Sequence, residues 1–485
     1  MAADPDEVYR LLIDANPWWE DGKVPAKLSH EYHRRDYFVL KDELNSKPIS
    51  AIAGPRQVGK TTLLYQLVEH LLASGVQPPL VLFVNFDLPG LTAAAKSPLN
   101  DCLNVYADRV LGRPWRRLGE KAYIFLDEIT KVENWHRDLK GWFDLKYPTK
   151  FLISSSSQSE LRSGAATSLT GRVSTHILLT WKFVDVLMYQ TDDQSWNNTG
   201  LRLRESFASA VRRRDPRILM TKLREVEATA TRGRASLRST LDRYLLLDGF
   251  PELLELRDLH RAAGRLREYL DLTIANDLTR VYQIRAPRLF YDLLGLLARE
   301  SGQLISYRNL GETLDVQERT VIDYLDHLES IFLVAQAQFF SESRAKRIRR
   351  QRKILVANPG IQNALLGRLD RRTLTDPSLM GRLAEAVVHD HAKRLVYCLK
   401  PGSEPSAFYW RDGHNREVDV VISIDDRPIP IEVKYRTNPH RDLEGLNAFL
   451  EENPSAPFGL VVTRDLVELS GRKLFVPLSH FLLMV

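Results

Sequence analysis

A glycine-rich stretch near the amino terminus, GPRQVGKTT, constrains this chain more than any other feature. An apolar run at residues 49–53 precedes it, and an amphipathic run from Thr61 onward follows it. When the GxxxxGK[ST] pattern joins a strand to a helix, its backbone N–H groups surround phosphate oxygens, and the positive end of the helix dipole strengthens the attraction. The sequence therefore predicts an ATP site formed by nine residues: Gly54, Pro55, Arg56, Gln57, Val58, Gly59, Lys60, Thr61 and Thr62.

A second signature indicates that the triphosphate is hydrolysed. In such a loop, Lys60 is expected to reach the β- and γ-phosphates, and the Thr61 hydroxyl is expected to ligate Mg²⁺. Further along, an apolar run at residues 122–126 ends in Asp127 and Glu128. We expect Asp127 to hold Mg²⁺ through water and Glu128 to orient and deprotonate the attacking water.

Two later positions are candidates for contacts with the γ-phosphate. The strand expected at residues 150–153 runs into four serines, residues 154–157, which could touch the γ-phosphate or cap the next helix. Arg172 could reach the γ-phosphate of its own or a neighbouring subunit, or it could be one of many surface arginines.

Bulk composition limits the class of protein. The 485 residues allow roughly three domains. The net charge of +6 is mildly basic, and two cysteines, Cys102 and Cys398, make a disulfide framework or a cysteine zinc site improbable. The start MAADPDEVYR lacks an apolar signal core, and no apolar run approaches the ~20 residues of a membrane span. We expect a cytoplasmic protein with no membrane contact.

The order of elements predicts an α/β protein with several parts. Alternating strands and helices imply a parallel sheet covered by helices on both faces, with an arginine-rich helical lid after it. The order helix, short strand, helix, helix, strand near residues 288–340 predicts a winged helix. The expected domains are an amino-terminal segment (1–48), a P-loop ATPase core (49–185), a helical lid (186–285), a winged helix (286–342) and a nuclease-like domain (343–485).

Two features bear on nucleic-acid binding, in opposite directions. The third helix of the expected winged helix carries Glu318, Asp323, Asp326 and Glu329, so its face is a poor partner for phosphates. By contrast, the segment SRAKRIRRQRK at residues 343–353 holds seven arginines and lysines. Such a run is typical of a nucleic-acid contact, although it could be a solvated loop.

The last third carries a second group of catalytic-type residues. A helix near residues 383–395 carries Glu385, and Asp419 precedes a strand with the order Glu432, Val433, Lys434. Alternate strand residues share a face, so Glu432 and Lys434 are expected to point together. This D…ExK pattern predicts that Asp419, Glu432 and Glu385 ligate Mg²⁺ and that Lys434 positions the attacking hydroxide.

With these residues in place, the chain resembles an archaeal and bacterial AAA-type ATPase family that couples a P-loop domain to a winged helix and a PD-(D/E)XK endonuclease-like domain. The resemblance rests on GPRQVGKTTL, FLDEITKVENW, LTGR, DGFPE, KILVANPG, GRLAE and EVD…IEVKYR. It implies DNA-linked ATPase work or a defence-type switch. Where the family has TGSS this chain has four serines, of which Ser156 best fits the sensor role, and Asn358 replaces the usual aspartate before Pro-Gly.

These observations combine into one expected function and one alternative. We expect an ATP-hydrolysing, DNA-binding AAA-type ATPase that moves or remodels DNA in a helicase- or branch-migration-like manner, with an attached Mg²⁺-dependent nuclease-like domain. Arg172 is the expected sensor or finger arginine, and a role in trans would need a homo-oligomer, a hexamer or smaller. The alternative is a nucleotide-controlled regulatory or defence switch whose carboxy-terminal domain is a non-cleaving scaffold.

Overall fold

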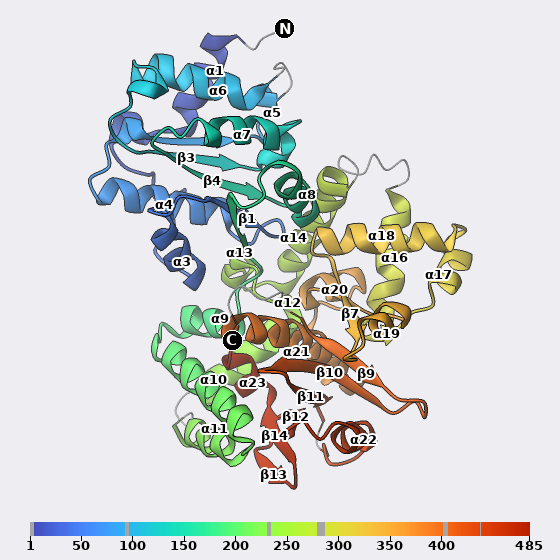
Figure 1. Ribbon diagram of the computed structural model, residues 1–485. Helices are drawn as coiled ribbons and strands as arrows, with labels where there is room; N and C mark the ends of the chain where they lie inside the picture. The colour runs from blue at the N-terminus through green and yellow to red at the C-terminus, as the bar shows by residue number, and fades with distance from the viewer. Residues whose placement is uncertain (1–3, 93–96, 230–233, 279–286, 401–405, 437) are drawn as a thin grey trace. The chain divides into compact units, whose positions relative to one another are not determined.

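A computed structural model describes residues 4–92, 97–229, 234–278, 287–400, 406–436 and 438–485 (Figure 1). The chain divides into two compact units, residues 1–179 and 180–485. The division lies close to the expected end of the ATPase core at residue 185. The finer division of the rest of the chain into lid, winged helix and nuclease-like domain stays a prediction.

The first unit contains, in chain order, α1 (Pro5–Ala15), α2 (Trp18–Asp21), α3 (Arg35–Glu43), β1 (Ile49–Ala53), α4 (Lys60–Ala73), β2 (Val81–Asn85), α5 (Pro89–Thr92), α6 (Pro98–Tyr106), β3 (Ala122–Asp127), α7 (Trp135–Asp144), β4 (Thr149–Ser155), α8 (Gln158–Ser168) and β5 (Val173–Ile177). Short 3₁₀ or π turns connect several of them.

The strands of the first unit form one parallel sheet in the order β2-β3-β4-β1-β5. This confirms the parallel α/β sheet expected from the sequence. The register pairs Ala53 with Ser155 and Leu126 with Ile153, so β1, β3 and β4 end at the same edge. The phosphate loop, the acidic pair and the serine run therefore all leave the sheet at its carboxyl edge.

Helices cover both faces of this sheet. Figure 1 shows α1, α6 and α7 on one face and α3 and α4 on the other. Residues of β1 and β3 are buried throughout, as two-sided cover requires. Helix α2 also belongs to this unit, because the indole N–H groups of Trp18 and Trp19 both donate to the Val81 carbonyl oxygen, at 3.0 and 2.9 Å.

The second unit contains α9 (Phe183–Thr191), α10 (Ser195–Arg213), α11 (Arg217–Thr229), α12 (Arg234–Leu247), α13 (Pro251–Glu255), α14 (Leu259–Leu272), α16 (Arg288–Arg299), β6 (Gln303–Leu304), α17 (Tyr307–Leu314), α18 (Glu318–Ser330), β7 (Val334–Phe339), α19 (Arg344–Arg349), β8 (Lys353–Val356), α20 (Pro359–Leu365), α21 (Pro377–Leu399), β9 (Phe408–Arg411), β10 (Glu417–Ile424), β11 (Arg427–Lys434), α22 (Glu444–Glu452), β12 (Gly459–Thr463), β13 (Glu468–Ser470), β14 (Lys473–Pro477) and α23 (Leu478–Leu483).

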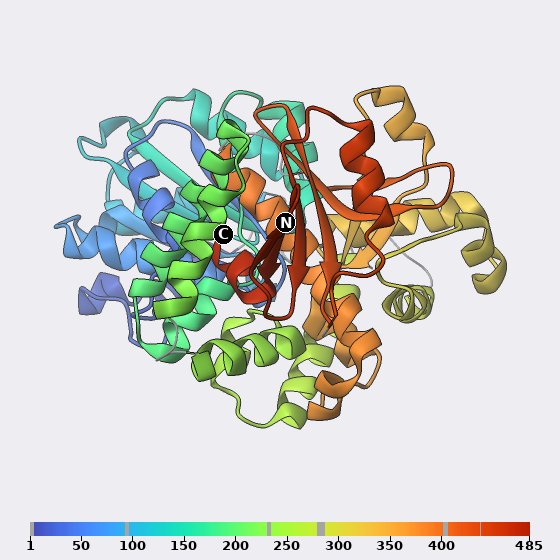
Figure 2. The same ribbon diagram turned by 90° about the horizontal axis from the view of Figure 1, so that it is seen from below.

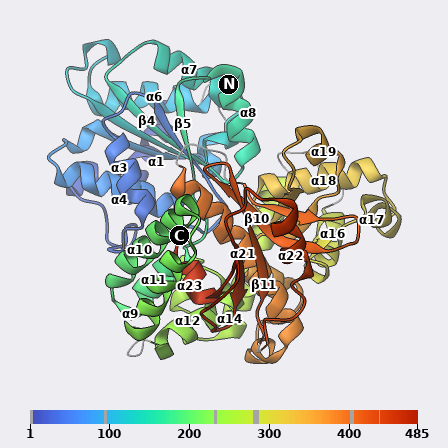
Figure 3. The same cartoon turned by 60° about the horizontal axis from the view of Figure 1, so that its bottom comes forward.

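A mixed nine-stranded sheet, β13-β14-β12-β11-β10-β9-β7-β8-β6, runs through the second unit. Strands β7 and β9 pair in parallel, with Gln338 opposite Phe408 and Phe339 opposite Tyr409. The expected boundary between residues 342 and 343 therefore falls inside one continuous sheet. Figure 2 shows the orange and red strands of this sheet side by side, and Figure 3 labels α21 and α22, which pack against β10 and β11.

The helices expected to form a lid pack within the second unit. Helix α10 contacts α9, α11 and α23, and α12 contacts α9, α20 and α21. The expected lid also includes residues 230–233 and 279–285, which lie outside the described residues. Its role as a cover for the nucleotide stays a prediction.

Candidate functional site

The phosphate loop of the first unit connects β1 to α4. Gly54 lies so close to the next segment of chain that an added Cβ would be 2.0 Å from the Leu178 carbonyl oxygen. Gly59 has φ 92°, a left-handed conformation that glycine adopts without steric cost, and α4 starts at the next residue. The spacing of the two glycines thus follows from one close contact and one tight turn.

Lys60 lies inside this loop. Its side chain is only 6% exposed, and Nζ donates hydrogen bonds to the carbonyl oxygens of Gly54 (2.9 Å) and Pro55 (3.0 Å). The same ammonium lies 3.4 Å from Oε1 of Glu128. The lysine charge is therefore centred between the loop and the acidic pair.

Thr61 and Asp127, the predicted Mg²⁺ ligands of this unit, are in direct contact. The Thr61 hydroxyl donates to Oδ2 of Asp127 at 2.7 Å, and the Ser154 hydroxyl donates to Oδ1. Burial, and next the charge of Glu128, raise the pKa of Asp127. Hydroxyl and carboxylate oxygens are ligands that Mg²⁺ prefers, so these residues fit the predicted ion.

Glu128 follows β3 in a left-handed conformation, with φ 52° and ψ 43°. Its Oε2 accepts a hydrogen bond from the Ser156 backbone N–H at 3.0 Å, and its own N–H donates to the Ser154 hydroxyl at 3.0 Å. Burial raises the pKa of this carboxyl, but the positive charges of Lys60 and Arg56 outweigh burial and hold the pKa below its usual value. The group is therefore ionised and suited to accept a proton.

The serine run contributes differently from what we expected. Ser156, predicted as the sensor, donates its backbone N–H to the Glu128 carboxylate. Ser154, which the sequence analysis did not single out, contacts both acidic residues. The β1–β4 register places Ser154 opposite Ile52, in the middle of the sheet edge. That register depends on long-range pairing, which a single sequence does not reveal.

Arg172 lies at the opposite edge of the sheet from the phosphate loop. Its carbonyl oxygen accepts from the Ile49 N–H at 2.8 Å, and Ile49 begins β1, whereas the loop follows the end of that strand. Its guanidinium pairs with Asp144 at 2.9 Å. Five strand residues span about 16 Å. The geometry therefore removes the alternative in which Arg172 acts on the nucleotide of its own unit; a role in a neighbouring subunit stays a prediction.

The carboxylates predicted to form a nuclease-like site lie in the second unit around a lysine that we had counted among the exposed basic residues. Lys353 starts β8, and its side chain is 3% exposed. Its Nζ lies 2.5 Å from Glu385 Oε1, 2.8 Å from Glu417 Oε1 and 3.7 Å from Asp419 Oδ1. We call Lys353 and the carboxylates of Glu385, Glu417 and Asp419 the lysine cluster.

Two further oxygens near the lysine cluster have protein partners, whereas the buried Oε2 of Glu432 accepts no hydrogen bond from the described residues. Asp419 Oδ2 accepts from the Val433 N–H at 2.8 Å, and Glu432 Oε1 pairs with Lys434 Nζ at 2.6 Å. Across the described ranges, no group of three or more His, Cys, Asp or Glu residues is arranged to hold a metal ion. The residues present therefore do not fit the Mg²⁺ that we expected at Glu385, Asp419 and Glu432, because a protein ammonium lies among the ligands.

The basic segment forms one wall of a pocket in the second unit. Rather than an open loop, part of it is helix α19. The walls of the pocket, which holds about 320 Å³, include four cationic residues and two carboxylates: Lys346, Arg350, Arg411, Arg416, Asp412 and Glu452. The cationic groups of Lys346 and Arg350 lie 5.7 and 5.4 Å from the Phe339 ring centroid, close enough for cation–π attraction. We call this feature the basic pocket.

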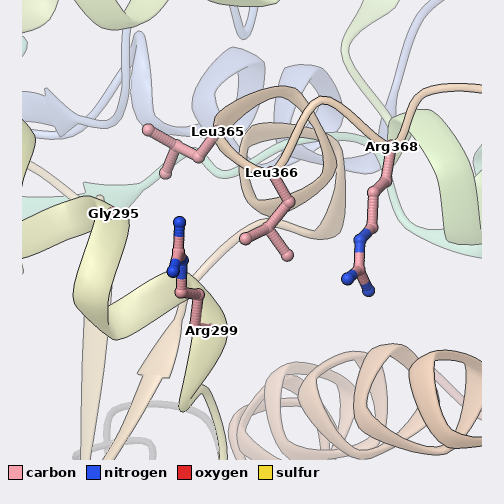
Figure 4. Close-up of a pocket in the computed structure, with 5 residues that line it drawn as sticks. All are labelled: Gly295, Arg299, Leu365, Leu366 and Arg368. Atoms are coloured by element: carbon pink, nitrogen blue, oxygen red, sulfur yellow. The ribbon is translucent and has the colours of Figure 1, made fainter.

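Another pocket of the second unit, of about 420 Å³, is lined by Gly295, Arg299, Leu365, Leu366 and Arg368 (Figure 4). Figure 4 shows the Arg299 side chain extending toward the two leucines. Both arginines are exposed. The pocket holds no carboxylate or hydroxyl among its lining residues, so it offers no acid–base chemistry.

Comparison with known families agrees with the fold of the first unit. Residues 46–187 match the family model described as an AAA domain, so this part of the chain is an AAA-type P-loop ATPase domain. Residues 238–372 and 380–481 match two domains of unknown function, DUF8612 and DUF4143. The AAA-type part of the expected architecture is thereby confirmed, whereas the winged helix and the endonuclease-like domain stay predictions.

Relatives along most of the chain are themselves uncharacterized. An uncharacterized protein of Methanocaldococcus jannaschii is 25% identical over 474 residues, which are 96% of this chain and 92% of that protein. An uncharacterized protein of Mycobacterium tuberculosis is 25% identical over 437 residues, 87% of this chain and 81% of that one. These similarities therefore assign no activity.

Solved structures that match this chain include two ORC structures of low sequence identity. The Aeropyrum pernix ORC2 protein in its ADP form is 15% identical, with a TM-score of 0.32, and the match covers 73% of this chain and 98% of that one. Drosophila ORC bound to GC-rich DNA and Cdc6 is 12% identical, with a TM-score of 0.23, and the match covers 83% of this chain and 74% of that one.

None of the helices in the described ranges has both the length and the apolar character of a membrane span.

Proposed function

We propose that the first unit binds ATP with Mg²⁺ and hydrolyses it, and that the whole chain uses this cycle to move or remodel DNA. One observation carries the hydrolysis proposal. The loop lysine, Lys60, lies within 3.4 Å of an ionised Glu128, while Thr61 touches Asp127. These are the four groups that phosphoryl transfer to water requires at one place.

The roles follow from these contacts. The backbone N–H groups of the loop and the start of α4 would hold the phosphates, and Lys60 would turn from the loop carbonyls to the β- and γ-phosphate oxygens. Thr61 and Asp127 would hold Mg²⁺, which when bound neutralises phosphate charge. Glu128, oriented by the Ser156 N–H, would take the proton from the attacking water.

The basic pocket supports DNA as the partner. It places Lys346, Arg350 and Arg411 beside two aromatic side chains, Phe339 and Trp410, while the guanidinium of Arg416 pairs with Asp412 at 2.6 Å. Cationic side chains bind the phosphate backbone of nucleic acids, and this attraction weakens as salt rises. The acidic exposed face of α18 is a poor phosphate partner, so we assign the contact to α19 and the β9–β10 turn.

A purified full-length protein tests the proposal directly. ATP turnover is measured alone and with single-stranded, duplex and junction DNA at two salt concentrations. We expect DNA to raise turnover several-fold and the stimulation to fall at higher salt. Turnover that no form of DNA changes would contradict the DNA part of the proposal and leave the hydrolysis part standing.

The lysine cluster favours a second candidate function. Because Lys353 lies among the carboxylates that would bind metal, we do not assign DNA cleavage to the second unit. A nucleotide-controlled switch with a non-cleaving scaffold fits this geometry equally well. Stimulation of turnover by a protein partner and not by DNA would favour the switch. If Arg172 acts in trans, either function requires an oligomer.

A further inference from the structure

We propose that the Lys353 ammonium is the resident cation of the lysine cluster and keeps divalent metal ions out of it. A single buried ammonium contacts three carboxylates that come from α21 and β10. Divalent ions such as Mg²⁺ and Mn²⁺ are bound by the same kind of oxygen. The lysine therefore takes the place that a metal would need.

The backbone holds Lys353 in this place. The residue pairs with Ala337 of β7 on one side and with Leu304 of β6 on the other, so its strand is fixed within the sheet. The Lys353 side chain is 3% exposed, so its ammonium is shielded from solvent. A buried charge that leaves its partners is strongly disfavoured. The lysine is thus a permanent part of the cluster and not a mobile side chain lying across it.

Gly302 lies against the Glu385 carboxylate and leaves it the space that it needs beside Lys353. Gly302 has φ 86°, and a Cβ added there would lie 3.1 Å from Oε2 of Glu385 and 3.2 Å from Oε1. The absent side chain leaves room for the carboxylate directly beside Lys353. Gly302 is itself held by a hydrogen bond from its N–H to the Ile354 carbonyl oxygen, at 2.9 Å.

Charge balance supports an internal cation. Lys353 places one positive charge beside the carboxylates of Glu385, Glu417 and Asp419. Lys434 pairs with Glu432. The two lysines offset part of the carboxylate charge without a divalent ion.

Mn²⁺ binding tests the inference. Electron paramagnetic resonance of free Mn²⁺ is measured with full-length protein carrying Asp127→Asn, which removes the predicted metal ligand of the nucleotide site. In this background we expect no Mn²⁺ site in the second unit. Adding Lys353→Met should create about one Mn²⁺ site per chain, because the carboxylates lose their cation. Adding Asp419→Asn as well should remove that site.

Two controls make the result specific. Lys346→Met removes an exposed lysine of the same segment and should add no Mn²⁺ site, and Lys353→Arg keeps a cation and should add none either. A background protein that already binds a Mn²⁺ ion which Asp419→Asn removes would overturn the inference. So would a folded Lys353→Met protein that binds no Mn²⁺. If Lys353→Met does not fold, Mn²⁺ titrations of the Asp127→Asn protein with and without Asp419→Asn decide between the outcomes. They measure whether the cluster with its native lysine binds Mn²⁺.

Discussion

Lys60 Nζ lies 3.4 Å from Glu128 Oε1. The residue expected to hold phosphates and the residue expected to activate water are thus an ion pair. The lysine helps to hold the pKa of Glu128 below its usual value, so the carboxylate is ionised before substrate chemistry begins. A phosphate that draws Lys60 away would leave Glu128 a stronger base, which couples ATP binding to activation of the water.

The first prediction concerns Glu128 as the base. Glu128→Gln should keep ATP binding, because the loop and Lys60 are unchanged, and should lower turnover by about 10²–10⁴-fold. Nucleotide binding and steady-state hydrolysis are measured on the same preparation. Glu133→Gln, at an exposed position nearby, is the matched control and should be silent. Normal turnover in Glu128→Gln would remove Glu128 from the mechanism.

A second prediction separates Ser154 from Ser156. Ser154 acts through its hydroxyl on both acidic residues, whereas Ser156 contacts Glu128 through its side chain and through a backbone N–H that an alanine also has. Ser154→Ala should therefore cost about 1 kcal/mol of transition-state stabilisation, or roughly fivefold in kcat, and Ser156→Ala less. The opposite order would show that the Ser156 side chain has the sensor role expected from the sequence.

Arg172 gives a third prediction. Because it lies at the far edge of the sheet, Arg172→Ala should leave turnover unchanged at protein concentrations where the chain is monomeric. Any loss should appear only where specific activity rises with protein concentration. Asp144→Asn, which frees the guanidinium from its partner without removing it, is the control. A loss of activity that is the same at every concentration would restore a role within one unit.

The fourth prediction concerns the stability of the first unit. Burial raises the pKa of Glu43, but hydrogen bonds from His176, Ser50 and Ser174 outweigh burial and lower the pKa to about 2. A carboxyl with a lowered pKa stabilises the folded state at pH values above the usual carboxyl pKa. This contribution is lost as the pH falls toward 2. Glu43→Gln should cost about 1–2 kcal/mol at pH 7, after allowance for partial exposure.

Denaturant unfolding at a series of pH values checks this expectation. The difference between the native chain and Glu43→Gln should be constant from pH 7 to about 5 and should shrink below the usual glutamate pKa. Glu133→Gln, whose carboxylate is exposed, should show no such pH dependence. A difference that grows as pH falls would contradict the assignment of the low pKa to Glu43.

The basic pocket gives the fifth prediction. Lys346→Glu and Arg350→Glu should each weaken DNA binding and each reduce the slope of log affinity against log salt by about one. Arg299→Glu, in the other pocket, removes an exposed arginine away from the basic segment and serves as the control. Fluorescence anisotropy with a labelled duplex measures all three. Unchanged affinity in both pocket variants would place the DNA contact elsewhere.

Local signals in the sequence were enough to predict the first unit. The spacing from Gly54 to Thr61 and the apolar run before Asp127 define a strand, a loop and a helix within a few residues of one another, and the parallel sheet followed from their order. The residues that we missed depend on pairing between distant strands. Ser154 reaches Asp127 only through the order in which β1, β3 and β4 lie in the sheet.

The same reason explains Lys353 and Arg172. In the sequence, Lys353 ends a run of seven basic residues and reads as exposed, but pairing of β8 with both β6 and β7 buries it. Arg172 is the last residue of the LTGR step, which resembles a sensor, but β5 joins the sheet beside β1, which places the arginine at the amino edge. Neither pairing has a local signature.

Steady-state ATP hydrolysis by the full-length protein in Mg²⁺, compared with its Lys60→Ala variant, tests the central claim most directly. The account predicts turnover in the native protein and a loss of about 10²-fold or more in the variant, because the variant lacks the ammonium between the loop and Glu128. Native turnover no higher than that of Lys60→Ala would contradict it.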